Sequence, residues 1–539
     1  MRSAAADCDT LARMHPWLAH YAAHVPAAIP LPHETLLETF ECRARRWPES
    51  VGVFHFETAI SFGALAEQAL RFATQLAAWG IGQGDRVAVS LQNDPEFLVA
   101  QYGTWMRGAI LVPLSALLKQ REIAFHLTDS GARAYICRDE IFEEQAQHAL
   151  AGTKVEQVML SSQFASLPAG DPVAHASAGL DDAAYLVYTS GTTGSPKGAI
   201  SLHRHIAFNA HIFRTWLDAT ERDVIAGIAP LFHITGLVAQ IGLSAVSGAP
   251  LILAHRFHAT ETLRLIERHR ATISVAAITA YIALMKEPIA VDLASWTKCC
   301  TGGAPVPPAI VEQFQQRLGV RIHNTYGLTE SNSPSHLTPL GAVAPVDAVS
   351  GALAIGLPIP NSVAKIVDPE NPAREMPPGE PGEIALAGPM IFAGYWNQPA
   401  ASAQAFHDGF FLTGDIGIMD REGWFYVVDR KKDMIVASGF KVWPREVEDV
   451  LYQHPAVREA AVVGVPDDYR GETVKAIIAA RTPVTGEEIM QFCKERLAAY
   501  KYPRIVEFVD EIPKTASGKF LRRAFRTTVP VPVPAGPKS

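Results

Sequence analysis

The sequence lacks the features that mark zinc-bound, disulfide-linked and secreted proteins. It has only six cysteines in 539 residues, and none of them forms a C-x-x-C pair. Cysteines this sparse argue against a zinc site and a disulfide framework, and they favour a reducing compartment. The first ten residues carry one arginine with no apolar stretch behind it, which is unlike a secretory signal or a membrane anchor.

Long apolar runs are scarce as well. The one uncharged run long enough to cross a bilayer, residues 234–254, contains Gln240, three glycines and Pro250. This composition predicts a buried helix followed by a strand over residues 250–254. We therefore expect a cytoplasmic protein with no transmembrane segment.

Positive charge is not in excess. Lysine and arginine number 47 against 55 aspartates and glutamates, which gives a formal net charge of −8. A protein that binds nucleic-acid phosphates as its main activity needs a basic surface, so we expect no nucleic-acid partner. Hydrophobic residues make up 48% of the chain, too many for a disordered protein, and the length suffices for several domains.

Strands and helices alternate through the first half of the chain. Apolar residues recur at helical spacing over residues 65–79, and Gly80 and a strand over 86–91 follow. A helix over 95–107, strands over 109–114 and 133–137, and a helix–strand pair over 260–277 continue the pattern. Strands separated by helices of this length predict an α/β fold with doubly wound parallel sheets.

The pattern changes twice toward the C-terminus. After residue 360 apolar strands are separated by proline and glycine turns, which predicts a β-rich subdomain. After residue 430 a helix opened by Pro444, strands near 457–465, 473–480 and 505–509, and a helix near 486–498 predict a small α+β domain. We predict domains over 1–429 and 430–527 and a proline-rich tail over 528–539.

A hydroxyl-rich loop is the strongest local signal. It follows an apolar strand over residues 183–188 and continues to Lys197 and Gly198. Exposed backbone N–H groups, hydroxyls and a lysine suit a polyphosphate. The loop is not a Walker A motif, because Lys197 follows a proline and precedes a glycine.

With this loop the sequence resembles the acyl-adenylate-forming enzymes, the AMP-binding superfamily of acyl-CoA synthetases, carrier-loading adenylation domains and beetle luciferases. The resemblance covers residues 35–525, and seven further motifs occur in the family's order. They are Pro230-Leu231-Phe232-His233, Gly302-Gly303-Ala304-Pro305, Tyr326-Gly327-Leu328-Thr329-Glu330, Thr413-Gly414-Asp415, Asp429-Arg430, Ser438-Gly439-Phe440-Lys441 and Pro513-Lys514-Thr515-Ala516-Ser517-Gly518-Lys519.

The resemblance implies a site for ATP and Mg²⁺. Tyr326 stacks on adenine, Thr329 contacts phosphate, and Glu330 holds the Mg²⁺ as a hard carboxylate ligand. Asp415 and Arg430 contact the ribose. The further nucleotide-binding positions that the resemblance implies are Thr189, Ser190, Gly191, Thr192, Thr193, Lys197, Gly303, Ala304 and Pro305.

The main candidate residue for catalysis and those for coenzyme A binding lie in the C-terminal part of the chain. Lys519 lies in a basic segment that, taken alone, reads as a solvated charged surface. In the family the second lysine of this motif bridges the carboxylate and the α-phosphate, so Lys519 is the main catalytic candidate. The resemblance implies further catalytic roles for Glu330, Thr329 and Lys197. The resemblance also implies a hinge at Lys432, where a mobile C-terminal domain rotates between the two reaction steps, and pantetheine contacts at Gly439 and Lys441.

Two residues are candidates for the acyl pocket. An isolated histidine at position 233 would pack in a core, but in the family this position gates the acyl pocket. Family members with long acyl tunnels often have glycine before the tyrosine, whereas this chain has Thr325. A β-branched side chain there predicts a shortened or bent pocket and a preference for short to medium, branched or aryl acids.

The predicted function is an ATP-dependent acyl-CoA ligase. The carboxylate attacks the α-phosphate of ATP, and the thiol of coenzyme A then displaces AMP. The alternatives are an acyl-AMP ligase that loads a separate carrier protein, a luciferase-like oxidation, which no residue demands, and a non-catalytic acyl or nucleotide sensor. The sequence leaves the oligomeric state and the identity of the acid open.

Overall fold

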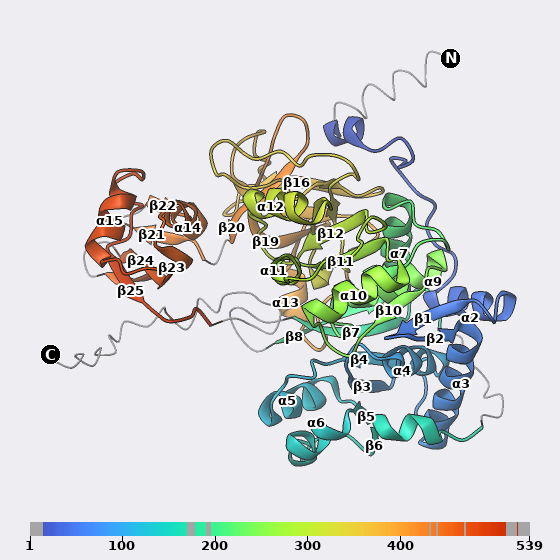
Figure 1. Ribbon diagram of the computed structural model, residues 1–539. Coiled ribbons are helices and arrows are strands. Elements are labelled where there is room, and N and C mark those ends of the chain that lie inside the picture. The colour runs from blue at the N-terminus through green and yellow to red at the C-terminus, as the bar shows by residue number, and fades with distance from the viewer. Residues whose placement is uncertain are drawn as a thin grey trace, which may run out of the picture.

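The computed structural model describes residues 15–169, 178–189, 196–430, 433–437, 440–467, 471–513 and 525. In these residues the strands form four sheets. Figure 1 shows two large sheets and a third, smaller one in the main body, with the fourth sheet in a unit beside it.

The largest sheet has nine strands and a parallel centre. Its order is β15 (Leu357–Pro358), β14 (His336–Leu337), β13 (Ile322–Tyr326), β12 (Lys298–Gly302), β11 (Ile273–Ala277), β9 (Ile225–Ala226), β10 (Leu251–Leu253), β1 (Val51–His55) and β2 (Thr58–Ser61). The six strands from β13 to β1 run parallel. Their carboxyl ends therefore meet at one edge, where ligands of open α/β sheets bind.

The second sheet has six strands. Its order is β6 (Gln157–Leu160), β5 (Ala134–Cys137), β3 (Arg86–Ser90), β4 (Ile110–Pro113), β7 (Ala183–Thr189) and β8 (Lys197–Leu202). All neighbours are parallel except β8, which is antiparallel to β7. The predicted doubly wound α/β architecture is confirmed.

Helices and short turns connect these strands. They are η1 (Pro16–His20), α2 (Leu36–Arg46), α3 (Phe62–Ala78), α4 (Pro95–Met106), α5 (Gln120–Ser130), α6 (Asp139–Glu144), η2 (Ala146–His148), η3 (Ser161–Ser166), α7 (His203–Trp216), α8 (Ile234–Gly236), η4 (Leu237–Gly242), α9 (Leu243–Ser247), α10 (Ala259–His269), α11 (Ile278–Lys286), α12 (Pro308–Leu318), η5 (Thr329–Ser331) and α13 (Pro399–Gln404). Helix α4 is mostly apolar and is buried at every residue except Glu96. Gly80 has φ +69°, as a residue beyond a helix end should.

The uncharged run folds as the sequence predicts. Residues 234–247 form one continuous buried helical segment, α8, η4 and α9, in which η4 has π-helical geometry, and β10 follows. Among the described helices, none combines the length and the apolar character that a membrane crossing requires.

The third sheet confirms the predicted β-rich subdomain. It consists of β16 (Val363–Val367), β17 (Gly382–Ala387), β19 (Phe410–Met419) and β18 (Phe406–His407), and β20 (Phe425–Arg430) pairs with β19. All its pairings are antiparallel, and short turns join β18 to β19 and β19 to β20.

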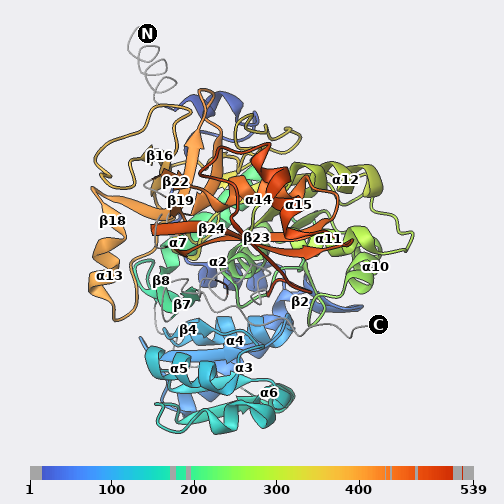
Figure 2. The same ribbon diagram turned by 90° about the vertical axis from the view of Figure 1, so that its left-hand side faces the viewer.

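The C-terminal unit has its own sheet and core. The sheet contains β22 (Phe440–Val442), β21 (Ile435–Ala437), β24 (Gly471–Ala480), β23 (Val457–Asp467) and β25 (Ile505–Phe508), with helices α14 (Pro444–Tyr452) and α15 (Gly486–Lys494). Val447, Leu451, Ile478 and Ile489 belong to its separate hydrophobic cluster. Figure 1 shows this orange-to-red unit beside the main body, next to β20, and in the turned view of Figure 2 it lies in front of the main body.

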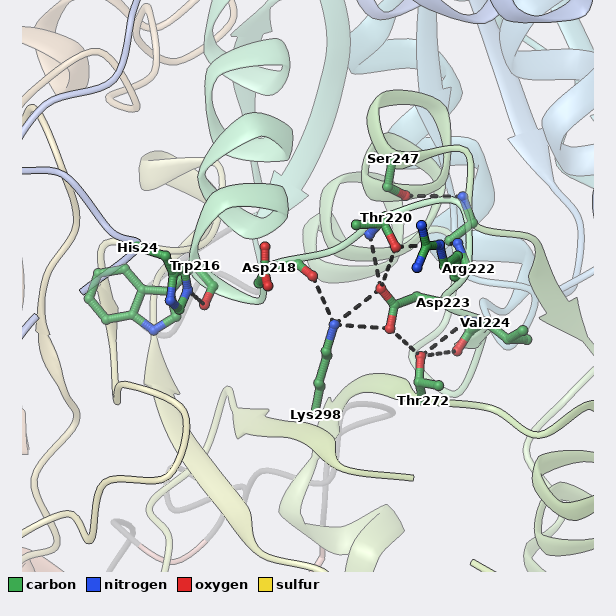
Figure 3. A network of polar contacts seen from close by, with 11 residues as sticks. His24, Trp216, Asp218, Thr220, Arg222, Asp223, Val224, Ser247, Thr272 and Lys298 are labelled. Carbon is green, nitrogen blue, oxygen red and sulfur yellow. Dashed lines mark hydrogen bonds and ion pairs between the residues drawn. The ribbon is translucent and has the colours of Figure 1, made fainter. Parts of the chain in front are cut away.

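A polar network ties the amino ends of the nine-stranded sheet together (Figure 3). Asp223, just before β9, accepts hydrogen bonds from Thr272 Oγ1 at 2.7 Å and from the Thr220 backbone N–H at 2.9 Å. Lys298 Nζ lies 3.0 Å from Asp223 Oδ1 and also donates to the Asp218 carbonyl oxygen at 2.9 Å. The network joins the starts of β9, β11 and β12, at the edge opposite to their carboxyl ends.

Candidate active site

The carboxyl ends of β12 and β13 lie side by side because the two strands pair in parallel, Thr301 opposite Asn324. The Gly-Gly-Ala-Pro motif runs out of β12, and Tyr326 is the last residue of β13. Gly303 has φ +77°, a backbone conformation that favours glycine, and the segment leading to Pro305 is largely exposed. This edge of the sheet therefore presents an open backbone surface next to a tyrosine ring.

Tyr326 is fixed by a residue from another sheet. Its hydroxyl donates to Asp415 Oδ2 at 2.7 Å, and His336 packs edge-on against its ring at 5.7 Å. Asp415 lies in β19 opposite Arg430 of β20, and its backbone N–H donates to Thr413 Oγ1 at 3.1 Å. Two predicted nucleotide-binding residues that are 89 positions apart in sequence are thus in direct contact.

A second polar group combines Glu330, Tyr395 and Lys197. The Tyr395 hydroxyl donates to Glu330 Oε1 at 2.9 Å, and Lys197 Nζ lies 4.8 Å from the centre of the Tyr395 ring. Backbone bonds hold the three segments together: Phe392 N donates to the Glu330 carbonyl at 2.8 Å, and Trp396 N to the Gly198 carbonyl at 2.8 Å. A carboxylate is thereby held at the hydroxyl end of the Tyr395 side chain, and an ammonium group over the face of its ring.

Tyr395 is a candidate site residue that the sequence analysis missed. Burial and the negative charge of Glu330 raise its pKa well above the usual value, so the phenol stays a neutral donor. It lies opposite Ala199 in an isolated antiparallel bridge. Its local sequence, Gly394-Tyr395-Trp396, signals a turn, and the contact to Glu330 depends on tertiary pairing that no local pattern reveals.

The hydroxyl-rich loop is described only at its ends. Thr189 closes β7 and Lys197 opens β8; the two residues pair opposite each other, with Thr189 Oγ1 donating to the Lys197 carbonyl at 3.4 Å. Thr329 begins the short η5 turn that carries Glu330. Ser190, Gly191, Thr192, Thr193, Lys432, Gly439 and Lys519 lie outside the described residues, as do the side chains of Arg430 and Lys441.

His233 occupies a different element from the two polar groups. It is half-buried and caps α8, where its Nδ1 accepts a hydrogen bond from Thr235 N at 3.4 Å. The segment before it is held by Asn93, whose Nδ2 donates to the Gly227 and Ala229 carbonyls at 3.0 Å each. His233 therefore has a fixed backbone position at the start of the buried helical segment.

Thr325 is buried between β12 and β14. Its Oγ1 donates to the His336 carbonyl at 3.0 Å, and burial lowers the pKa of His336 to about 3, so that imidazole stays neutral. A Cβ on Gly302 would lie 3.0 Å from the Thr325 methyl carbon and 2.5 Å from its carbonyl oxygen. The threonine methyl therefore borders the space that Gly302 leaves.

Comparisons with known proteins agree with these motifs. The profile of the AMP-binding enzyme family matches residues 40–396, and that of the AMP-binding enzyme C-terminal domain matches residues 446–519. A long-chain-fatty-acid–CoA ligase of Bacillus subtilis is 35% identical over 94% of this chain and 97% of its own length. A feruloyl-CoA synthase of an Amycolatopsis species is 36% identical over 90% of this chain and 97% of its own.

The structural comparison leads to the same enzymes. The o-succinylbenzoate CoA synthetase of Bacillus subtilis, solved in complex with its acyl-adenylate intermediate, superimposes with a TM-score of 0.82 at 30% identity. The match covers 92% of this chain and 99% of that chain.

Proposed function

The chain belongs to the family of AMP-binding enzymes and is an ATP-dependent acyl-CoA ligase, and we propose that its adenylation centre is the pair of polar groups around Tyr326 and Glu330. It uses ATP, Mg²⁺ and coenzyme A. The observation that carries the proposal is the contact of Tyr395 with both Glu330 and Lys197 beside the ends of β12 and β13.

The nucleoside half of ATP fits the first group. The Tyr326 ring provides a stacking surface for adenine, and its bond to Asp415 fixes the ring at the end of β13. Asp415 is 5% exposed, and its carboxylate can accept hydrogen bonds from ribose hydroxyls, next to the position where β20 brings Arg430. Gly303, Ala304 and Pro305 line the same edge.

The phosphates fit the second group. Lys197 supplies a positive charge at the end of the hydroxyl-rich loop, and Thr329 a hydroxyl one residue from Glu330. The carboxylate of Glu330 fits a nucleotide-bound Mg²⁺, because that ion takes one or two protein carboxylates and completes its shell with phosphate oxygens and water. When bound, the ion neutralises phosphate charge that develops as pyrophosphate leaves.

The reaction has two steps. A carboxylate oxygen of the acid bonds to the α-phosphorus while pyrophosphate leaves, and the thiol sulfur of coenzyme A then bonds to the acyl carbon while AMP leaves. Lys519 is proposed to bring the two anions of the first step together, on the basis of its motif. The residues of the centre act by positioning and by charge, and no covalent bond to the enzyme is needed.

We also propose domains over 1–429 and 430–527, with a hinge at Lys432 and pantetheine contacts at Gly439 and Lys441. One contact already links the two sides of this boundary: the Arg445 backbone N–H donates to the buried Asp429 Oδ2 at 3.0 Å. This bond spans Lys432, so a rotation of the C-terminal domain about Lys432 would act on it directly.

For the acid we propose short to medium, branched or aryl carboxylic acids in preference to palmitate-like chains. Buried Thr325 beside Gly302 supports a shortened pocket, and the similarity to a feruloyl-CoA synthase supports an aryl acid. His233, at the start of α8, is proposed to line the pocket. A reducing, cytoplasmic location is proposed because the five described cysteines are all free thiols.

The deciding experiment is a panel of carboxylic acids assayed for AMP formation with and without coenzyme A. An acyl-CoA ligase releases AMP in step with thioester only when acid, ATP and coenzyme A are all present. Pyrophosphate release that depends on the acid, without AMP or thioester formation when coenzyme A is added, would point to carrier loading, and no turnover with any acid would point to a sensor.

A further inference from the structure

Two histidines and an aspartate form a third polar cluster, outside the candidate active site. His55 ends β1, Asp94 precedes α4 after β3, and His255 follows β10. Strands β1 and β10 are parallel neighbours, with His55 opposite Leu253. The cluster lies at the carboxyl ends of the nine-stranded sheet, separated from β12 by β9 and β11, and it meets the chain that leaves the six-stranded sheet.

The donor atoms of the cluster converge. His255 Nδ1 forms an ion-pair contact with Asp94 Oδ1, and His55 Nε2 lies 3.7 Å from the same oxygen. All three donor atoms lie within 4.8 Å of one another. In a tetrahedral zinc site with bonds of 2.0–2.2 Å, the donors lie about 3.4 Å apart, so small rotations of the side chains would close the set around an ion.

The surroundings hold these side chains in place. Arg138 Nη1 binds the other oxygen, Asp94 Oδ2, at 3.1 Å and thereby orients the carboxylate. Asp94 is only 5% exposed and, although it is the N-cap residue of α4, makes no side-chain capping bond in the described structure. The Asn93 backbone N–H donates to the His255 carbonyl at 2.7 Å and fixes His255 at φ +43°, a costly conformation for a residue other than glycine.

His55 is poised as a ligand. Its Nε2 is buried and has no hydrogen-bond partner among the described residues, which is costly for an imidazole nitrogen unless something else satisfies it. His255 is half-exposed, so its side of the cluster is open to solvent.

We propose that His55, Asp94 and His255 bind a divalent transition-metal ion of the zinc type. Two imidazoles and one carboxylate select such an ion over Mg²⁺, which prefers oxygen ligands alone. The exposed side of His255 leaves the fourth position to water. The bound ion cross-links the ends of β1 and β10 to the start of α4 and acts as a structural clamp between the two large sheets.

The clamp lies next to the acyl-binding segment. Asn93, adjacent to Asp94, accepts a hydrogen bond from Leu231 N at 2.9 Å through its Oδ1 and holds the chain two residues before His233. Metal binding at Asp94 therefore stabilises the loop that leads into α8, and the bound ion raises the melting temperature of the protein by mass action.

The test uses the full-length, tag-free, chelator-treated chain with Zn²⁺ or Co²⁺ as the probe. Equilibrium dialysis should show one Zn²⁺ per chain that is lost in His55→Ala and His255→Ala, each weakening binding by at least about 10-fold, since even supporting residues are worth about 10- to 100-fold. Co²⁺ should give visible absorption bands in the wild type and lose them in both variants.

His258→Ala is the matched control, because His258 is exposed and lies three residues from His255. It should bind Zn²⁺ as the wild type does. His255→Ala changes a half-exposed side chain, and its circular dichroism spectrum and acyl-CoA formation in Mg²⁺ should match the wild type. The proposal is overturned if the wild type binds no Zn²⁺, or if folded His255→Ala retains wild-type Zn²⁺ affinity and Co²⁺ bands. Because the readout is metal binding, the experiment tests the metal site independently of the ligase assignment.

Discussion

Replacing Tyr395 by phenylalanine isolates one hydrogen bond of the proposed adenylation centre. The change removes the hydroxyl that donates to Glu330 Oε1 at 2.9 Å, and it keeps the ring beneath the Lys197 ammonium. The carboxylate then loses one donor that helps to orient it, while the fold around residue 395 keeps its packing. We expect weaker adenylation without loss of structure.

The expected size follows from the charge on the acceptor. Hydrogen bonds to ionised groups contribute about 1.5–3 kcal/mol. At about 1.4 kcal/mol per factor of ten, acyl-adenylate formation should slow by about 10- to 150-fold if the full bond acts in the transition state. Tyr395→Leu should lose a further ~0.5–2 kcal/mol, because it also removes the aromatic face near Lys197.

The assay separates the two half-reactions. Exchange of pyrophosphate into ATP reports adenylation, and thioester formation from supplied acyl-AMP reports the second step. Tyr395→Phe should impair the first, raise the Mg²⁺ concentration needed for half-maximal rate, and leave the second within about twofold of wild type, since the second step makes no use of the Glu330 carboxylate. A Tyr395→Phe enzyme with wild-type exchange and Mg²⁺ dependence would refute the role of this contact.

Four further predictions address catalysis, specificity and stability. Lys519→Ala should slow adenylation by ~10² or more and spare transfer to coenzyme A. Lys432→Pro should instead slow transfer to coenzyme A and spare adenylation, because proline fixes φ at the hinge. For each variant, equal damage to both half-reactions would contradict the role proposed for that lysine. Thr325→Gly should shift the optimum of kcat/KM to longer chains in a C4–C18 series. Each methylene that the pocket accommodates adds at most about 1–3 kcal/mol of binding free energy. A wild-type maximum at C16 or beyond would contradict the short-pocket proposal. Lys298→Met should lower the urea midpoint of the main body by an amount equivalent to about 3–5 kcal/mol, because it leaves the mostly buried Asp223 carboxylate without its cation. An unchanged midpoint would contradict this and show that the threonine and backbone donors are enough to stabilise the carboxylate.

Elements with strong periodicity were predictable from the sequence. The helix expected over residues 95–107 is α4 (Pro95–Met106), and the strands expected over 86–91 and 133–137 are β3 and β5. In each case the apolar pattern and a flanking glycine or proline agree, so local preference and tertiary burial favour the same structure.

The order of strands was not predictable in the same way. Strand β1 pairs with β10, which lies some 200 residues further along the chain, and this pairing is what brings His55 near His255. Likewise Tyr395 reaches Glu330 because its segment pairs with β8 and because Phe392 N donates to the Glu330 carbonyl. Such contacts depend on how whole sheets pack, and no local periodicity encodes them.

The most direct test of the adenylation centre is a single-turnover measurement of acyl-adenylate formation without coenzyme A. With the best acid from the panel, the wild type should form acyl-AMP and pyrophosphate in equal amounts, and Glu330→Gln should form them about 10²- to 10³-fold more slowly, because an amide cannot hold Mg²⁺ as a carboxylate does. Folded Glu330→Gln that forms acyl-AMP at the wild-type rate would contradict the account.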